Sequence, residues 1–174
     1  MGRSKLFQAL ALAFAAVLGT ALTIGDSAPD FSLQGSDGKT YQLSELLQEG
    51  AVVLAWYPKA FTKGCTIECK SLTEKGHLIR EYEATYFMVS VDPIEDVTKF
   101  AESMSADFPL LADPDKSVAQ QYGVMSPYGF SNRHNVYIGT DGKVLAVDTS
   151  VNPQTAAEDI ATRLGELGIA KRET

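Results

Sequence analysis

The stretch YPKAFTKGCTIEC, Tyr57–Cys69, contains both cysteines of the chain and lies at the centre of its predicted fold. An apolar run, Ala51–Trp56, precedes it, and a helical pattern from about Thr66 to Tyr82 follows it. The sequence therefore predicts a buried strand, a loop and then a cysteine at the start of a helix. The free N–H groups and the dipole of a helix N-terminus stabilise a thiolate, which is the reactive form of cysteine. The stretch is typical of a site of thiol chemistry.

The composition indicates one acidic globular domain. The chain has 174 residues, of which 45% are hydrophobic and 21% charged, and its formal net charge is −7. This is enough apolar material for one packed core, and it is unlike the composition of a disordered chain. A nucleic-acid-binding protein would need a basic face, so we expect no nucleic-acid partner. A single pair of cysteines does not make a disulfide scaffold.

The N-terminus has the pattern of a signal peptide. Arg3 and Lys5 form a positively charged start, Leu6–Leu18 is almost wholly apolar, and small residues suited to cleavage follow. We expect residues 1–21 to be the signal peptide, residues 22–174 to form the mature domain, and the protein to be exported to the periplasm. The alternatives are an uncleaved membrane anchor facing the periplasm and a buried N-terminal helix. Cleavage removes two of 15 basic and none of 22 acidic residues, which takes the net charge from −7 to −9.

The remaining patterns predict an α/β fold with a mixed central sheet flanked by helices. We expect strands at Thr40–Leu43, Ala51–Trp56, Thr85–Val91 and Phe108–Leu111, and a hairpin of Arg133–Ile138 and Val144–Asp148. We expect helices at Ser44–Leu47, which Ser44 would cap, and at Thr66–Tyr82, Asp92–Ser103, Asp113–Tyr122 and Pro153–Leu167. The order βαβαβ followed by ββα predicts helices packed on a single sheet.

The motif Pro58-x-x-x-Thr62-x-x-Cys65 resembles the active-site signature of the peroxiredoxins, which have a thioredoxin fold. Other segments resemble the family's opening, second strand and middle part, namely Gly25–Phe31, Val89–Asp92, and Phe108–Pro114 with Tyr122–Val124. The resemblance covers residues 24–168 and is closest to the branch called peroxiredoxin Q or bacterioferritin comigratory protein. It implies a monomeric thiol-dependent peroxidase with a peroxide substrate, a thioredoxin-like reductant, and neither cofactor nor metal.

The resemblance also implies roles for single residues. Cys65 would be the peroxidatic nucleophile, and Arg133, which stands just before a predicted strand, would hold thiolate and peroxide together. Thr62 would offer its hydroxyl to the peroxide, and Pro58 would shield the thiolate from water. Taken singly, these residues could also be a structural cysteine, a surface arginine and turn residues. Glu68, one helical turn after Cys65, either orients Arg133 or is a solvated surface acid.

Cys69 has two interpretations. As a resolving cysteine it would attack the sulfenic acid of Cys65 and form a disulfide, which an oxidising compartment permits. Residues four apart on a helix lie on one face, about 6 Å from each other, but closing the bond would require the first turn to unwind. Alternatively, Cys69 is a buried free thiol and the cycle uses one cysteine. The resembled branch commonly has its second cysteine five positions after the first, and here the spacing is four.

Two other classes of protein use a similar pair of cysteines. Sco-type copper chaperones have two cysteines and a histidine, a set that Cys65, Cys69 and His134 could imitate as soft copper ligands. The proline that usually follows the second cysteine in that family is Lys70 here, and Arg133 would have no purpose. A disulfide oxidoreductase of thioredoxin type would need two residues between the cysteines, and this chain has three.

Overall fold

The structure is a computed structural model that describes residues 20–173. Its strands are β1 (Ser32–Gly35), β2 (Thr40–Gln42), β3 (Ala51–Trp56), β4 (Ala84–Ser90), β5 (Leu110–Ala112), β6 (His134–Ile138) and β7 (Val144–Asp148). Across these residues they form one seven-stranded sheet in the order β2-β1-β5-β4-β3-β6-β7. Strand β4 is parallel to β3 and β5, and the other neighbouring pairs are antiparallel. The predicted mixed sheet is confirmed.

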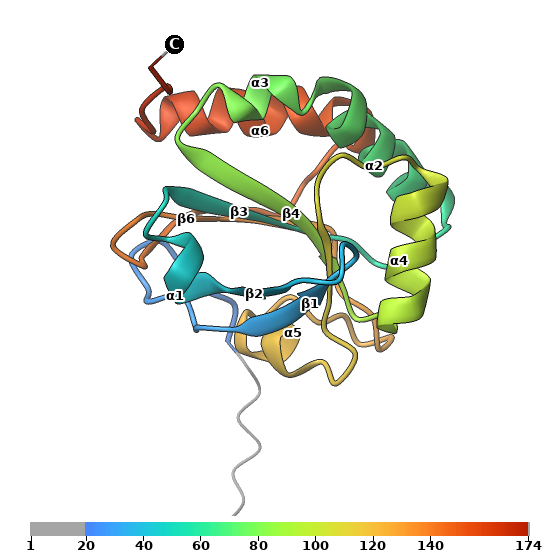
Figure 1. Ribbon diagram of the computed structural model, residues 1–174. Coiled ribbons are helices and arrows are strands. Elements are labelled where there is room, and N and C mark those ends of the chain that lie inside the picture. The colour runs from blue at the N-terminus through green and yellow to red at the C-terminus, as the bar shows by residue number, and fades with distance from the viewer. Residues whose placement is uncertain (1–19, 174) are drawn as a thin grey trace, which may run out of the picture.

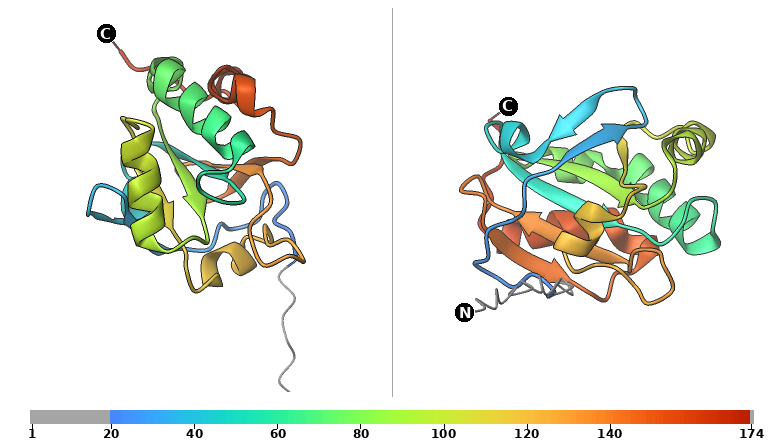
Figure 2. Two further views of the ribbon diagram at one scale, coloured as in Figure 1. Left: turned by 90° about the vertical axis from the view of Figure 1, so that its right-hand side faces the viewer. Right: turned by 90° about the horizontal axis from the view of Figure 1, so that it is seen from below.

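Helices cover both faces of the sheet, as Figures 1 and 2 show. They are α1 (Leu43–Leu46), α2 (Lys63–Lys75), α3 (His77–Arg80), α4 (Ile94–Ser103), α5 (Ser117–Gln121) and α6 (Ala156–Glu166), the last preceded by a 3-10 turn at Pro153–Thr155. Helices α2, α3, α4 and α6 contribute to the core on one face, and α1 and α5 to the core on the other. This is the arrangement of helices around a sheet that the element order predicts.

Strand β3 shows why helices must cover both faces of the sheet. Its six residues are all buried, and they alternate between the two cores: Val53 and Ala55 point toward α2, and Val52 and Leu54 point toward α5. A strand buried on both faces appears in a sequence as a continuous apolar run, which is how Ala51–Trp56 was predicted. The carboxyl end of β3 feeds the loop that contains Pro58 and Thr62.

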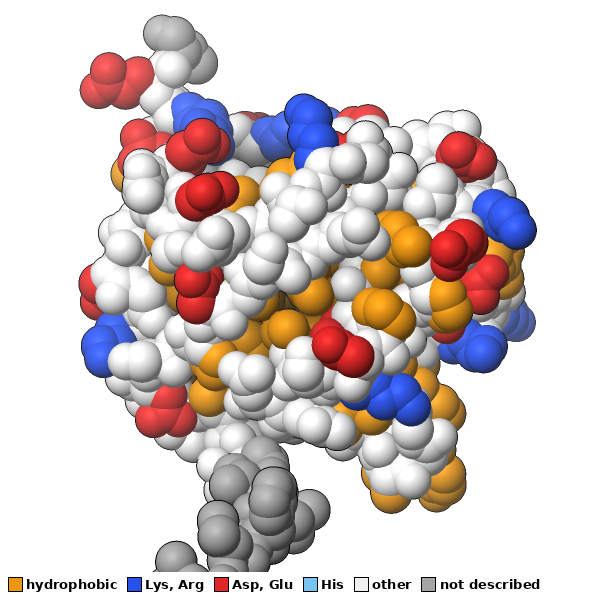
Figure 3. All heavy atoms as spheres, turned by 60° about the horizontal axis from the view of Figure 1, so that its bottom comes forward, with side chains coloured by type: hydrophobic (Ala, Val, Ile, Leu, Met, Phe, Trp, Pro, Cys, Tyr) orange, Lys and Arg blue, Asp and Glu red, His pale blue; other side chains and the backbone are white. Residues whose placement is uncertain are grey.

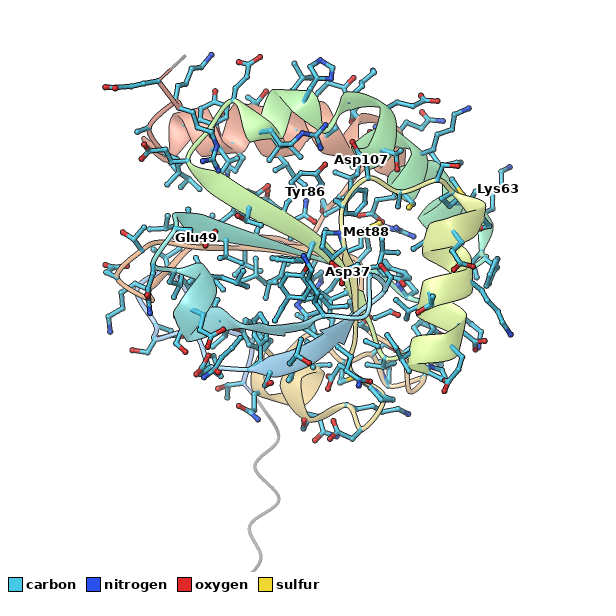
Figure 4. The ribbon with its side chains drawn as sticks, viewed as in Figure 1. Asp37, Glu49, Lys63, Tyr86, Met88 and Asp107 are labelled. Atoms are coloured by element: carbon cyan, nitrogen blue, oxygen red, sulfur yellow. The ribbon has the colours of Figure 1, made fainter. Side chains whose placement is uncertain are left out.

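The helix after this loop differs from the prediction at both ends. It begins at Lys63, three residues before the predicted Thr66, so Cys65 lies inside its first turn. It ends at Lys75, and Gly76 separates it from α3. A Cβ atom at Gly76 would lie 2.0 Å from the Tyr86 hydroxyl, so the chain passes too close to β4 for any larger residue. Figure 4 shows Tyr86 on β4 beneath these two helices.

One expectation about local structure was wrong, and one strand was missed. Ser44 does not cap α1, whose N-cap is Gln42; the Ser44 N–H instead donates to the Asp30 carboxylate at 3.0 Å. Strand β1 was not predicted, although Leu33 and Gly35 are buried on it in alternation with exposed residues. It is a short strand that exists because it pairs with both β2 and β5.

The later boundaries shift by a few residues. Strand β5 begins two residues after the predicted Phe108, and α5 begins at Ser117, later than the predicted Asp113. Asp113 still caps α5, because its carboxylate accepts the N–H of Ala119 at 2.7 Å and that of Val118 at 3.4 Å. The cap therefore acts from outside the helix, which the predicted boundary did not anticipate.

The predicted signal peptide, residues 1–21, lies outside the described residues except for its last two positions. In the part of the chain that is described, no helix has the length and apolar character needed to span a membrane.

Candidate active site

Cys65 lies in the first turn of α2, with Thr62 as the N-cap. The first backbone hydrogen bond of this helix runs from the Thr66 N–H to the Thr62 carbonyl at 2.9 Å. The N–H groups of residues 63–65 therefore have no acceptor within the helix, and the positive end of its dipole lies beside them. The Cys65 side chain is fully buried at this point. This is a position that stabilises negative charge on sulfur.

Arg133 reaches Cys65 from the residue just before β6. Its Nη2 donates to Cys65 Sγ at 3.3 Å, and its Nη1 pairs with the carboxylate of Glu68. Burial alone would lower the pKa of Arg133, but Glu68 and Cys65 raise it, and the net shift is upward. The guanidinium is therefore charged and is shared between a thiol and a carboxylate. Of the two interpretations of Glu68, the one in which it orients Arg133 is confirmed.

Glu68 is a fully buried carboxyl group with one satisfied oxygen. Its Oε2 binds Arg133, and its Oε1 has no partner among the described residues. Burial raises the pKa of Glu68 to about 7, and the attraction of Arg133 opposes that rise. Burial therefore favours the neutral form of Glu68, and the pairing with Arg133 favours the carboxylate.

Cys69 lies one turn after Cys65, and its side chain is also fully buried. Burial raises the pKa of the Cys69 thiol to about 12; the nearby Glu68 adds to the rise, and Thr73 opposes it. Both cysteines are free thiols. A buried, protonated thiol is a weak nucleophile.

Pro58 and Thr62 border the site from the loop. Pro58 is half-buried directly after the buried Tyr57, and Thr62 is exposed. Thr62 Oγ1 donates to the Lys59 carbonyl at 2.8 Å. The hydroxyl hydrogen of Thr62 is thus used inside the loop, and the lone pairs of its oxygen are available to accept a hydrogen bond.

Three residues that support the site were not predicted. A Cβ atom at Gly64 would lie 2.9 Å from Arg133 Nη2, so glycine gives the guanidinium its space. Ser131 Oγ donates to the carbonyl of Tyr57 at 2.6 Å, and Asp92 Oδ2 accepts the N–H of Ala60 at 2.8 Å. One signal was available for Asp92: it follows the strand parallel to β3, and the carboxyl ends of parallel strands meet at one edge of a sheet.

His134 lies away from the cysteines. It pairs directly opposite Trp56 in the ladder of β3 and β6, and the Trp56 side chain belongs to the core on the α5 side of the sheet, whereas Cys65 and Cys69 belong to the core on the α2 side. Directly opposed residues point to the same face, so His134 points away from α2. Within residues 20–173 no group of three His, Cys, Asp or Glu side chains could hold a metal ion. The copper-site hypothesis built on Cys65, Cys69 and His134 was wrong in its geometry.

Comparison with known proteins identifies the family. The sequence model of the AhpC/TSA family matches residues 24–147. The chain belongs to the AhpC/TSA family. A putative peroxiredoxin of Mycobacterium tuberculosis is 38% identical to this AhpC/TSA protein over 141 residues, covering 79% of this chain and 92% of the relative. Peroxiredoxin Bcp of Escherichia coli is 33% identical over 130 residues, covering 71% and 83%.

A solved structure agrees with these relatives. The crystal structure of peroxidoxin BcpB from Mycobacterium tuberculosis superposes with a TM-score of 0.74 at 34% identity, covering 82% of this chain and 96% of that one. This AhpC/TSA protein is therefore a thiol-dependent peroxidase with the thioredoxin fold of the peroxiredoxins. The resemblance to the branch of peroxiredoxin Q and bacterioferritin comigratory protein is confirmed. None of these findings supports a copper chaperone.

Proposed function

We propose that Cys65 is the peroxidatic cysteine of this peroxidase and that Arg133 activates it. The observation that carries the proposal is the 3.3 Å contact of Arg133 Nη2 with Cys65 Sγ, at a helix start whose first N–H groups are unused. Both features favour negative charge on the sulfur, and the thiolate is the form that attacks a peroxide.

In the proposed reaction, the Cys65 thiolate donates an electron pair to the nearer oxygen of a hydroperoxide. The S–O bond forms, the O–O bond breaks, and the leaving oxygen takes up a proton to become an alcohol or water. Arg133 and the free N–H groups of α2 stabilise the negative charge while it moves from sulfur to the leaving oxygen. Cys65 is left as a sulfenic acid.

Thr62 and Pro58 would control how the peroxide approaches. Because the Thr62 hydrogen is donated to the Lys59 carbonyl, the Thr62 oxygen would accept the O–H of the incoming peroxide and orient it. Pro58 lacks an N–H group and is half-buried beside the loop, so it would keep water from the sulfur.

We assign Cys69 the role of resolving cysteine. Its sulfur would attack the sulfenic acid of Cys65; the S–S bond forms, the S–O bond breaks, and the oxygen leaves as water. The step requires the first turn of α2 to unwind, because the two side chains project in parallel from one face of the helix. A dithiol protein of thioredoxin type would then supply the two electrons that restore both thiols.

A peroxide-consumption assay on the mature protein with a dithiol reductant tests the two roles. We expect Cys65→Ser to lose all turnover, because it lacks the nucleophile. Cys69→Ser should keep one rapid turnover per molecule, because the first step does not use Cys69. Normal turnover by Cys65→Ser would overturn the assignment of the nucleophile.

Mass spectrometry of the peroxide-treated protein tests Cys69 separately. The expected product is an intramolecular Cys65–Cys69 disulfide. A free thiol at Cys69 beside an oxidised Cys65 would reject the resolving role and would leave a one-cysteine cycle, with the nucleophile unaffected.

We further propose that residues 1–21 are removed on export and that the peroxidase works in the periplasm. The charged start, apolar segment and small residues of this stretch support the proposal. A cytoplasmic thioredoxin could not reach such a protein, so its reductant would be a periplasmic thioredoxin-like protein. N-terminal sequencing of protein from a periplasmic extract should begin at Leu22; an intact N-terminus in the membrane fraction would instead support an anchor.

A monomer fits the apolar surface. In the described part of the chain the large apolar side chains that are exposed are Ile24, Phe61, Tyr128 and Phe130. Figure 3 shows one face, on which apolar side chains lie among polar and charged ones. Obligate dimers usually bury a continuous apolar surface, so we propose a monomer. Light scattering coupled to gel filtration should give the mass of one chain, and a concentration-independent dimer mass would contradict this.

A further inference from the structure

The loop between β3 and α2 is anchored at its first residue. The N–H of Tyr57 donates to the Val89 carbonyl at 2.9 Å, and the Tyr57 carbonyl accepts Ser131 Oγ at 2.6 Å. These two bonds fix the end of β3. They do not reach the turn that leads into the helix.

The middle of the loop is held by a carboxylate that lies two residues after β4. The Ala60 N–H donates to Asp92 Oδ2 at 2.8 Å, and Ser90 Oγ donates to the same oxygen at 2.9 Å. Among the residues that the structure describes, the Ala60 bond is the one that joins residues 58–62 to a distant element. The bonds of Thr62 stay within the loop and the first turn of α2.

The bond between Ala60 and Asp92 is buried at both ends, with relative exposures of 6% and 8%. No basic side chain within residues 20–173 forms an ion pair with Asp92, so its partners are the loop N–H and Ser90. A buried N–H that loses its acceptor favours opening of its segment, on the order of tenfold in the equilibrium. Among the hydrogen bonds of the described residues, this acceptor is therefore the one that ties the middle of the loop to another part of the fold.

The next residue stores strain. Phe61 has a φ of 65°, in the left-handed region that bulky residues rarely adopt. The residue is 56% exposed, and its ring meets Phe100 edge-on, with 5.3 Å between the ring centroids. A strained turn of this kind persists only where the surroundings hold it. Here the holding bond, from Ala60 to Asp92, lies directly before the strained residue.

We propose that Asp92 is a positioning residue that latches this loop closed. The latch fixes Thr62, and with it the start of α2, in the geometry in which Cys65 meets Arg133 and peroxide. When the latch opens, the first turn is free to unwind and Cys69 can reach Cys65. The proposal deepens the proposed function and rests on it for the roles of the two cysteines.

Whether the latch is closed or open determines which of two reactions the Cys65 sulfenic acid undergoes. In the closed site, its sulfur attacks an oxygen of a second hydroperoxide; an S–O bond forms, the O–O bond breaks, and a sulfinic acid and an alcohol or water result. In the open site, the Cys69 sulfur attacks instead and water leaves. A weaker latch favours the disulfide over the sulfinic acid, and it also weakens the reaction with peroxide.

The test compares two buried acids that both bind backbone N–H groups. Asp92→Ala removes the latch. Asp113→Ala is the matched control, because Asp113 is buried and accepts the Ala119 N–H at 2.7 Å, but it lies at the start of α5. Asp92→Asn should rescue the latch, since its amide oxygen can accept the Ala60 N–H. Ser90→Ala, which removes only one partner of Asp92, gives a milder variant in case Asp92→Ala does not fold.

Hydrogen exchange of the reduced protein is measured first, because it does not depend on the roles of the cysteines. We expect the hydrogen-bonded amides of Ala60 and Thr66 to exchange on the order of tenfold faster in Asp92→Ala, less so in Ser90→Ala, and at nearly the native rate in Asp92→Asn and Asp113→Ala. Unchanged exchange in Asp92→Ala, or equal acceleration by Asp113→Ala, would overturn the latch.

The reaction is measured second. With a dithiol reductant present, Asp92→Ala should raise the KM for peroxide on the order of tenfold and lower the hyperoxidised fraction of Cys65 several-fold. Faster exchange without either change would overturn the positioning role. Absence of any Cys65–Cys69 disulfide in the native protein would instead reject the proposed role of Cys69, and the latch would still be judged by exchange and KM.

Discussion

The loops that follow β3 and β5 are built alike but are held differently. Each leaves a buried parallel strand, passes through one residue with left-handed backbone and enters a helix; the two residues, Phe61 and Lys116, both have a φ of 65°. In the loop after β5, Asp113 supplies its own carboxylate to α5. The loop after β3 has no acid of its own and uses Asp92, two residues after the end of β4.

This difference separates a structural helix start from a reactive one. A cap supplied by the loop itself forms wherever the loop forms. A contact supplied by a residue outside the loop exists only once β3 and β4 are paired, and in the proposed cycle the start of α2 opens while the rest of the fold stays intact. The start of α2 also depends on Arg133, which again comes from another part of the chain. The part of the molecule that must change shape during the proposed cycle is the part held by distant residues.

The largest expected effect comes from removing the distant arginine. Arg133→Ala should lower kcat/KM for peroxide about 10²–10³-fold, as loss of a donor to developing negative charge commonly does. Arg133→Lys should recover little, because one ammonium group cannot bridge Cys65 and Glu68 as the guanidinium does. Steady-state kinetics measure both variants.

Arg163→Ala is the matched control for that experiment. Its guanidinium also pairs with two acids, Asp148 and Glu166, but it is half-buried on α6 and contacts neither cysteine. Near-native kinetics are expected for it. A loss of less than tenfold in Arg133→Ala would contradict the proposed role of Arg133. It would also remove this difference between the starts of α2 and α5.

A smaller effect is expected from crowding the same arginine. The Cβ atom of Gly64→Ala would lie 2.9 Å from Arg133 Nη2, so the guanidinium must shift away from Cys65. We expect kcat/KM to fall roughly tenfold with little change in melting temperature, because alanine is a better helix former than glycine. Lys63→Ala is the control: its side chain is exposed, and Figure 4 shows it on the outer side of α2. Full activity of Gly64→Ala would show that Arg133 can keep its contact with Cys65 beside the added Cβ atom.

Glu68 and Asp113 should differ in the pH range over which they affect the stability of the fold. Burial raises the pKa of Glu68 from 4.5 to about 7 and that of Asp113 from 3.8 to about 6. A raised carboxyl pKa means that the folded protein binds the proton more tightly, so stability is lost as the pH rises through these windows. Glu68→Gln should flatten the decline between pH 4.5 and 7, and Asp113→Asn the decline between 3.8 and 6.

Urea unfolding at several pH values measures this prediction. Glu74→Gln, which makes the same substitution on the exposed surface of α2, is the control. A profile for Glu68→Gln that is parallel to the native one would show that Glu68 is not the group that titrates in this range.

The smallest effect is expected at the left-handed residue of the other loop. Lys116→Gly should raise the free energy of unfolding by about 0.5 kcal/mol, because relief of the left-handed conformation slightly exceeds the entropy that glycine loses on folding. Peroxidase kinetics should not change, since α5 is far from the site in sequence and lies on the other face of the sheet. Thermal and urea unfolding measure whether the free energy of unfolding of Lys116→Gly rises or falls. A fall would contradict the argument that the left-handed conformation strains Lys116.

The elements that depend on local pattern were predicted well, and those that depend on distant contacts were not. Strands β3 and β4 and the hairpin of β6 and β7 lie within a residue of their predicted bounds, because each is an apolar run beside clear turn residues. The start of α2 was predicted three residues late, and the break at Gly76 was not predicted at all. The break at Gly76 reflects the close approach of Tyr86 on β4, and the loop before α2 is bonded to Asp92, two residues after β4.

The contacts of the site also divide into those that were predicted and those that were not. The pairing of Cys65 with Arg133 was predicted through family resemblance, and the pairing of Glu68 with Arg133 was one of two open interpretations. The contribution of Gly64 could not be predicted, because its reason is the space that Arg133 occupies. The placement of His134 was also beyond prediction, since it depends on which side of the sheet β6 presents it.

By itself, the sequence determined that the protein has a mixed α/β sheet and that a cysteine lies at the start of a helix after a buried strand. Periodicity, turn residues and helix N-termini are local properties, and they can be recognised in a single chain. Only the tertiary structure decided what holds that helix start. Asp92 acts on a residue 32 positions earlier, and Arg133 acts on one 68 positions earlier. Which distant side chains meet is set by the order of strands in the folded sheet, and so is the burial that keeps Cys69 a thiol.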